Sequence, residues 1–209
     1  INREKLQEGF LEIQKEIHKT IIFVTHDIRE AIKLGDKILI LDRGNLVQYD
    51  DTLNIVHTPK NQFVEDLLGT DRGLKGLELI RIQDNYDTDY FSLNSEEKIS
   101  VQEAVERLKK NQRPFAFVVD GQDRLVGYVT RKELGKVEDK NQPFTPHIKE
   151  TTSIRPQANL MEALSMMFTT SITSAPVVND KDKLLGVVRF KELIDKVEEI
   201  TLDVQEEEE

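Results

Sequence analysis

Residues 1–19 carry an apolar side chain at every third or fourth position, a spacing that predicts an amphipathic helix. These positions are Leu6, Phe10, Ile13 and Ile17. Residues 21–24, Ile-Ile-Phe-Val, then form a continuous apolar run. Because such a run has no polar face, it predicts a strand that is covered on both faces, as in a parallel sheet. A second helix is expected to follow and to end at about Leu34.

The residues directly after this run suggest chemistry. His26 would lie at the carboxyl end of the predicted strand, where open α/β sheets place ligand-contacting side chains. Asp27 is a suitable N-cap for the following helix, and Glu30, three residues later, would complete a capping-box pair. The alternative is a histidine that packs at a strand end without any chemistry. Residues 20–31 alone leave both interpretations open.

Residues 37–68 alternate between short apolar runs and turn residues, which predicts a β-hairpin followed by two helices. The strands are expected at residues 37–41 and 46–49 around a turn at 42–45, and the helices at 52–57 and 59–68. Three glycines then lie among charged residues between Gly69 and Gly76. This composition predicts a linker over residues 69–78.

The second half of the chain contains an internal repeat with a period of 59 residues. The window from Gln102 to Leu134 aligns without a gap on the residues 59 positions later. A duplication of this length indicates two copies of one supersecondary unit that bury a shared face. Each copy is predicted to contain a strand, a helix, two strands joined by a turn, and a closing helix. In the second copy these elements are expected at Ile154 and at residues 160–168, 175–178, 185–190 and 191–197.

Composition narrows the classes of protein that fit. With 38% hydrophobic and 33% charged residues, the chain has the composition of a soluble globular protein. The absence of cysteine excludes disulfides and thiolate metal sites. A formal net charge of −10 argues against a nonspecific nucleic-acid binder, which needs a basic face. The other histidines, His18, His57 and His147, have no metal or triad partners at recognisable spacing, so we expect no metal site and no independent enzyme.

The repeated residues resemble a tandem pair of CBS domains. The resemblance rests on Ala-Pro-Val-Val at 175–178 before Leu-Gly-Val-Val at 185–188, and on Phe-Val-Val at 117–119 before Val-Gly-Tyr-Val-Thr at 126–130. It implies an α/β fold of two β-α-β-β-α repeats, at residues 79–139 and 140–200, followed by an acidic tail at 201–209. Such pairs typically bind adenine nucleotides in clefts between the strands and commonly form dimers.

Three positions depart from the usual nucleotide motif of that family. The motif normally ends in an Asp that holds ribose hydroxyls, whereas this sequence has Glu133 and Glu192 there. Arg189 replaces the hydroxyl residue that Thr130 supplies in the first repeat. The longer carboxylate weakens the case for ordinary AMP or ATP binding. Arg189 is either a bidentate partner for a phosphate or a solvated arginine at a strand end.

The first part of the chain resembles the end of an ABC transporter ATPase domain, and the residues that carry this resemblance are 20–31 and 35–44. In that family the histidine at the position of His26 is the switch residue that contacts the γ-phosphate of ATP. The phosphate-loop sequence G-x-x-x-x-G-K-[ST], the strand with the catalytic Glu and the LSGGQ-type signature are all missing. We therefore expect residues 1–68 to be the C-terminal segment of such a domain. ATP and Mg²⁺ would then be used only by a full-length subunit.

An ABC ATPase that carries a CBS pair resembles the ATP-binding subunits of importers for glycine betaine, carnitine or choline. This resemblance implies a homodimer, permease partners, no nucleic acid, and a peripheral location at the cytoplasmic face of the membrane. It also implies that the CBS pair binds cyclic di-AMP at a dimer interface and inhibits uptake. The ligand-binding positions would be Phe91, Arg113, Phe115, Thr173, Ser174, Ala175, Val187 and Arg189.

Two alternatives to the cyclic di-AMP receptor remain open. The CBS pair could bind AMP or ATP, or it could sense ionic strength without a small ligand, because screening changes steeply over physiological salt. The sequence also makes a prediction about residues 20–70. Without the rest of its sheet the strand at 21–24 would keep an exposed apolar edge, so we expect this segment to pack on another copy or to be readily cleaved by proteases.

Overall fold

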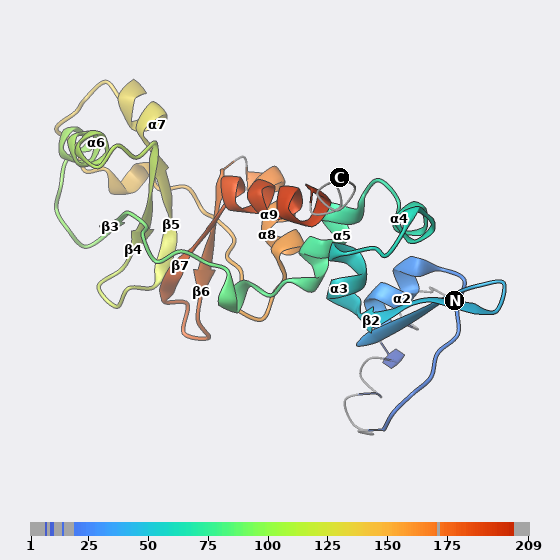
Figure 1. The fold of residues 1–209 in the computed structure, drawn as a ribbon. Coiled ribbons are helices and arrows are strands. Elements are labelled where there is room, and N and C mark those ends of the chain that lie inside the picture. The colour runs from blue at the N-terminus through green and yellow to red at the C-terminus, as the bar shows by residue number, and fades with distance from the viewer. Residues whose placement is uncertain (1–6, 8, 11–13, 15–18, 171, 203–209) are drawn as a thin grey trace. The chain divides into compact units, whose positions relative to one another are not determined.

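The computed structural model describes residues 7, 9, 10, 14, 19–170 and 172–202. Contacts between residues divide the chain into two compact units, one of residues 1–76 and 196–209 and one of residues 77–195. Figure 1 shows the order of the helices and strands. Most of the helix predicted for residues 1–19 falls outside the described residues.

The first unit contains a β-hairpin and several short helices. Its elements are α2 (Ile28–Leu34), β1 (Lys37–Asp42), β2 (Asn45–Asp51), α3 (Thr52–His57) and α4 (Gln62–Leu68). The two strands pair antiparallel, and Arg43 and Gly44 turn the chain between them with φ angles of 49° and 84°. Ile38 and Ile40 of β1 are buried while Lys37, Leu39 and Leu41 are exposed, the period of two expected of a strand with one covered face. The predicted hairpin and both following helices are confirmed.

The start of α2 matches the prediction for its N-cap. The side chain of Asp27 accepts a hydrogen bond from the backbone N–H of Arg29 at 3.0 Å, which satisfies one of the free amides of the first turn. Glu30 accepts a hydrogen bond from the Thr25 hydroxyl at 2.7 Å. The helix therefore begins where the sequence predicts it.

The strand predicted at residues 21–24 does not form. Ile22 and Val24 are 87% and 89% exposed, and Phe23 contacts the ring of Phe10 with centroids 6.2 Å apart. A parallel strand takes all its hydrogen bonds from neighbouring strands. In the part of the chain that the structure describes, no strand pairs with residues 21–24. The prediction from β-branched composition is wrong here because strand propensity depends on that pairing.

The glycine-rich segment is a helix rather than the predicted linker. Helix α5 (Arg72–Leu79) occupies most of residues 69–78 and packs on the end of α9 (Phe190–Leu202). A Cβ atom on Gly73 would lie 2.7 Å from Cγ1 of Val197, and one on Gly76 would overlap the side chain of Ile200. These glycines therefore let two helices approach closely, a second use of the residue besides flexible loops.

The second unit contains the two repeats, and its mixed α/β fold confirms the predicted β-α-β-β-α order. The first repeat consists of β3 (Ser92–Asn94), α6 (Val101–Lys110), β4 (Phe115–Val119), β5 (Leu125–Thr130) and α7 (Arg131–Lys136). The second consists of α8 (Leu160–Thr170), β6 (Ser174–Val178), β7 (Leu184–Arg189) and α9. The first strand of the second repeat is reduced to one parallel bridge between Ile154 and Val177. Single turns of 3-10 helix lie at Ile82–Asp84 and Thr145–His147.

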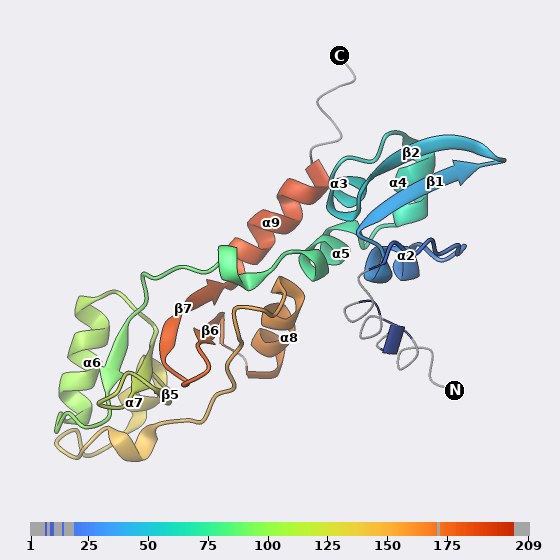
Figure 2. The ribbon, with the colours of Figure 1, turned by 90° about the horizontal axis from the view of Figure 1, so that it is seen from below.

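The two repeats are joined by reciprocal backbone hydrogen bonds. The N–H of Leu125 donates to the carbonyl of Asp182 at 2.9 Å, and the N–H of Leu184 donates to the carbonyl of Asp123 at 3.0 Å. These donors and acceptors are 59 positions apart, the period of the repeat. Both views place the β4–β5 and β6–β7 hairpins next to each other, between α6 on one side and α8 on the other (Figures 1 and 2).

One glycine in each repeat lets a strand accept a neighbouring backbone. Val187 of β7 pairs with Asp87, and Tyr128 of β5 pairs with Lys149. A Cβ atom on Gly186 would lie 2.5 Å from the carbonyl oxygen of Asp87, and one on Gly127 would overlap the carbonyl of Lys149. Both segments lead into a repeat, so glycine at these positions fixes where each repeat begins.

We expect limited proteolysis with trypsin or chymotrypsin to cut first within residues 19–33. Lys19 and Phe23 are exposed in backbone without regular structure, and flexible exposed backbone is the preferred substrate of proteases. Mass spectrometry of the early fragments identifies the cut sites. Resistance of this segment in a monomeric sample, or earlier cleavage inside residues 92–134, would contradict the prediction.

We expect Gly127→Ala to lower the free energy of unfolding by about 1–3 kcal/mol, because the added methyl group meets backbone that cannot move aside cheaply. Gly135, in the last turn of α7, provides the matched control because nothing lies within 4 Å of its Cβ position. Gly135→Ala should raise the free energy of unfolding by up to roughly 0.5 kcal/mol. Urea denaturation followed by far-UV circular dichroism measures both, since the chain has no tryptophan. Equal stability of the two variants would refute the close-contact argument.

Candidate functional site

A cavity of about 520 Å³ lies in the second unit, and both repeats line it. The first repeat contributes residues 89–91 just before β3, residues 113–115 at the start of β4, and Phe117 within β4. The second contributes the start of β6, the end of β7 and the first turns of α9. Cavities that bind small molecules usually measure about 300–1,000 Å³. The cavity is thus large enough to be a ligand site.

Most of the cavity wall is apolar and aromatic. Phe91, Phe115 and Phe117 line it from the first repeat, and Val187 and Ile194 line it from the second. The rings of Phe115 and Phe117 meet edge to face, with centroids 5.3 Å apart and an interplanar angle of 81°. Aromatic and branched aliphatic side chains of this kind can hold the flat face of a base.

The structure brings most of the predicted site residues together around this cavity. Seven of the eight line it: Phe91, Arg113, Phe115, Thr173, Ser174, Val187 and Arg189. Ala175 does not line it and is fully buried. Successive side chains of a strand point to opposite faces, so the residue after Ser174 is directed into the core. Ala175 therefore lies outside the lining of this cavity.

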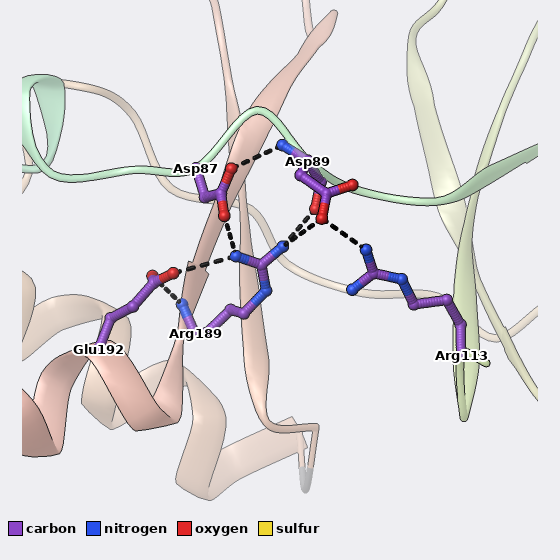
Figure 3. A network of polar contacts seen from close by, with 5 residues as sticks. All are labelled: Asp87, Asp89, Arg113, Arg189 and Glu192. Atoms are coloured by element: carbon purple, nitrogen blue, oxygen red, sulfur yellow. Dashed lines mark hydrogen bonds and ion pairs between the residues drawn. The ribbon is translucent and has the colours of Figure 1, made fainter. Parts of the chain in front are cut away.

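Arg189 lies at the end of β7 in a network of carboxylates, which Figure 3 shows. Its guanidinium forms an ion pair with Asp87 and a second one with Glu192, whose oxygen is 3.0 Å from Nη1. Glu192 also accepts a hydrogen bond from the backbone N–H of Arg189 at 2.9 Å. The carboxylate of Glu192 is therefore bound to Arg189, and it does not point freely into the cavity for a ribose.

Asp89 contacts an arginine of each repeat in this network. Its carboxylate oxygen Oδ2 accepts a hydrogen bond from Nη2 of Arg113 at 2.8 Å and lies 3.9 Å from Nη2 of Arg189 (Figure 3). The backbone carbonyl of Asp89 accepts a hydrogen bond from the same Arg189 nitrogen. One aspartate thus contacts two arginines from two different repeats.

Asp87 and Arg189 are held in their charged forms. A hydrogen bond from the backbone N–H of Asp89, followed by the hydrogen bond from Arg189, holds the pKa of Asp87 below its ordinary value. Burial disfavours the charged form of Arg189, but hydrogen bonds to Asp87 and Glu192 outweigh it and raise the pKa of the guanidinium. At neutral pH the site therefore holds fixed charges.

The local sequence explains why Glu rather than Asp follows the strand in both repeats. Glu192 is the third residue of α9, and its side chain reaches back to the N-cap residue Arg189, as a capping-box glutamate does. Glu133 holds the same position in α7, where its carboxylate accepts a hydrogen bond from the Thr130 hydroxyl at 3.2 Å. A shorter aspartate would not span this distance as readily.

The equivalent corner of the first repeat carries its charges in a different arrangement. Glu133 forms an ion pair with Lys149, the residue that pairs with Tyr128. The hydrogen bond from Lys149, supported by that from Thr130, lowers the pKa of Glu133. The segment that leads into the second repeat thus places Lys149 beside Glu133. The segment that leads into the first repeat places Asp87 beside Arg189.

Sequence reasoning missed several residues of the site. Asp87, Asp89 and Lys191 were not predicted, although Asp89 and Lys191 line the cavity and Asp87 binds Arg189. Asp87 and Asp89 lie in irregular backbone before β3, and the 59-residue period does not extend to them. The signal available was the pair of acidic residues on the segment that leads into the first repeat.

His26 belongs to the first unit and is exposed in the bend before α2. The strand that was expected to end at this histidine is absent, so its predicted position at a strand end is not observed. Helices within the described ranges are all too short or too polar to cross a membrane.

Comparisons with known proteins agree with this architecture. The sequence profile of the CBS domain matches residues 88–137 and 147–199. The CBS domain pair/ACT domain protein of Thermotoga maritima superposes with a TM-score of 0.52 at 18% identity, over 58% of this chain and 99% of that chain, which shows a shared fold.

Longer relatives are similar over almost the whole chain. The carnitine transport ATP-binding protein OpuCA of Listeria monocytogenes is 32% identical over 94% of this chain and 50% of its own length. The glycine betaine/carnitine/choline transport ATP-binding protein OpuCA of Bacillus subtilis is 30% identical over 94% of this chain and 52% of its own length. The chain spans about half the length of these relatives. Residues 88–137 and 147–199 therefore belong to the CBS-domain family, and the chain is a relative of ATP-binding proteins for the transport of carnitine, glycine betaine and choline.

Proposed function

We propose that this CBS pair is the regulatory part of an ATP-binding subunit of an osmoprotectant ABC importer, and that it binds cyclic di-AMP and thereby inhibits uptake. The relatives that support the importer are transport proteins for carnitine, glycine betaine and choline. ATP hydrolysis would belong to the whole subunit, because this chain has no phosphate-loop sequence. His26 would then act as the switch residue only in that larger context.

The chemistry of the cavity supports a nucleotide with few free hydroxyl groups. Its aromatic wall suits an adenine base, while Arg113 and Lys191 can meet a phosphodiester, and the hydroxyls of Thr173 and Ser174 can donate to polar edges. Each of these groups is already gathered on one cavity. Binding would therefore require rearrangement of side chains rather than of the fold.

The engagement of Glu192 is the observation that favours a cyclic dinucleotide over AMP or ATP. A ribose with two free hydroxyls is held well by an available carboxylate, which can accept a hydrogen bond from each. Glu192 instead binds the guanidinium and the backbone of Arg189. In cyclic di-AMP the 3′ oxygen is part of a phosphodiester, so no such pair of hydroxyls exists. The engagement of Glu192 with Arg189 therefore lowers the affinity for cyclic di-AMP less than the affinity for AMP or ATP.

The symmetry of the ligand favours a homodimer. Cyclic di-AMP has two identical halves, and a twofold protein dimer presents two identical surfaces to it. One ligand held between two copies would give one messenger per dimer. Within an importer, the subunit would contact permease subunits at the cytoplasmic face of the membrane, as an ATP-binding subunit must.

Isothermal titration calorimetry of this chain with cyclic di-AMP, AMP, ATP and cyclic di-GMP tests the proposal. We expect micromolar or tighter binding of cyclic di-AMP alone, near one messenger per two chains. Preferential binding of AMP or ATP would contradict the proposal for cyclic di-AMP and indicate that the site binds a mononucleotide. If no nucleotide bound, the receptor function would be refuted, and a sensor of ionic strength would be the remaining hypothesis.

A variant of the strand-end arginine tests the site. We expect Arg189→Ala to weaken cyclic di-AMP binding about tenfold or more, the effect typical of losing a hydrogen bond to a charged group. Arg124→Ala is the matched control, because it removes an arginine of the same unit that lies outside the cavity and pairs with Asp120. Circular dichroism checks that both variants fold. Unchanged affinity in Arg189→Ala would remove this residue from the site.

A further inference from the structure

The charges around Arg189 do not leave room for another anion. Three carboxylates, those of Asp87, Asp89 and Glu192, surround the guanidiniums of Arg113 and Arg189 (Figure 3). The cluster therefore has one more negative than positive charge. A phosphate that approached the arginines would meet this excess at short range, so the departure of one carboxylate would favour its binding beside the cavity-lining Lys191.

Asp89 is the carboxylate that the structure holds least. Asp87 is fixed by its ion pair with Arg189 and by backbone pairing with Val187, and Glu192 holds both the backbone and the side chain of Arg189. The side chain of Asp89 is 76% exposed, against 38% for Asp87 and 39% for Glu192. Its carboxylate makes one hydrogen bond of 2.8 Å, to Arg113, and a longer contact of 3.9 Å to Arg189.

Exposed ion pairs of this kind contribute little to stability, because water screens them and both side chains lose freedom. Asp89 also lies outside the strands and helices, so its side chain can turn into solvent without breaking a sheet. Arg113, which is one-third exposed and lines the cavity, would lose its carboxylate partner in that event. Arg189 would keep Asp87 and Glu192.

We propose that Asp89 is an internal competitor for the ligand: its carboxylate occupies the anion position between Arg113 and Arg189, and a phosphate group binds there by displacing it. The inference rests on the proposed nucleotide site and adds the residue that regulates it. The ligand class is a phosphate ester whose anionic group reaches the polar end of the cavity while its base contacts the aromatic wall. Affinity is then limited by the intramolecular contact of Asp89 with Arg113.

The test uses inorganic pyrophosphate as a probe of the anion position, independent of any base. In the full chain, nitrogen-15 NMR of arginine side chains follows the Arg113 signal, which the variant Arg113→Gln identifies by its loss. We expect Asp89→Asn to bind pyrophosphate about two- to fivefold more tightly than the parent chain, the range given by losing one exposed ion pair. Arg113→Gln should lose this binding.

Asp84→Asn is the matched control for net charge, because it removes an aspartate five residues earlier that does not line the cavity. Equal tightening in Asp84→Asn and Asp89→Asn would overturn the proposal, since the effect would then be long-range electrostatics. Absence of pyrophosphate binding in Asp89→Asn would also overturn it. A response of the Arg113 signal confined to Asp89→Asn supports it.

Calorimetry of the same variants with cyclic di-AMP separates this inference from the proposed function. If cyclic di-AMP binds and Asp89→Asn leaves its affinity unchanged, the messenger site stands and the role of Asp89 is refuted. If pyrophosphate binding tightens but no nucleotide binds, the anion position stands and the messenger function is refuted. Tightening of both ligands by a similar factor supports both.

Discussion

The close backbone contact at Gly186 is the constraint on which the candidate site depends. Because this residue has no Cβ, the backbone of Asp87 can lie against β7 and exchange hydrogen bonds of 2.8 and 2.9 Å with Val187. Val187 and Arg189 point to the same face of the strand, so this pairing brings the Asp87 carboxylate to the guanidinium. Asp89, two residues further, then reaches Arg113 of the first repeat. A backbone contact thus determines the charge arrangement of the cavity.

The equivalent contact in the first repeat has the same close approach of two backbones but different charged side chains. Gly127 admits the backbone of Lys149, and the lysine pairs with Glu133. Asp87 and Lys149 are 62 positions apart, whereas the strands and helices of the repeats are 59 apart. The segments that precede the two repeats therefore do not follow the 59-residue period, and their paired residues, Asp87 and Lys149, carry opposite charges. The two repeats therefore share their strands but differ in the charged residues at the strand ends. The strand end that carries Arg189 lines the cavity.

The sequence allows much of this to be predicted, and the failures have a common cause. The repeated hairpins and helices, and seven positions around the cavity, follow from local pattern and from the resemblance to CBS pairs. The strand at residues 21–24 fails because its stability would come from partner strands rather than from its own residues. The predicted linker fails because Gly73 and Gly76 serve close helix packing. Asp89 was missed because its contacts with both Arg113 and Arg189 arise only where the two repeats meet, and the acidic pair at 87 and 89 does not by itself indicate that meeting.

An anion position that already contains a carboxylate has a consequence for salt dependence. Two free arginines would lose affinity for a phosphate steeply as ionic strength rises, because every new ion pair is screened. If a phosphate replaces Asp89, one contact with Arg113 is exchanged for another, so screening weakens the bound and the unbound states alike. Binding by exchange therefore varies less with salt than binding to bare cations. Under the proposed function, this would keep the response to the messenger separate from changes in ionic strength.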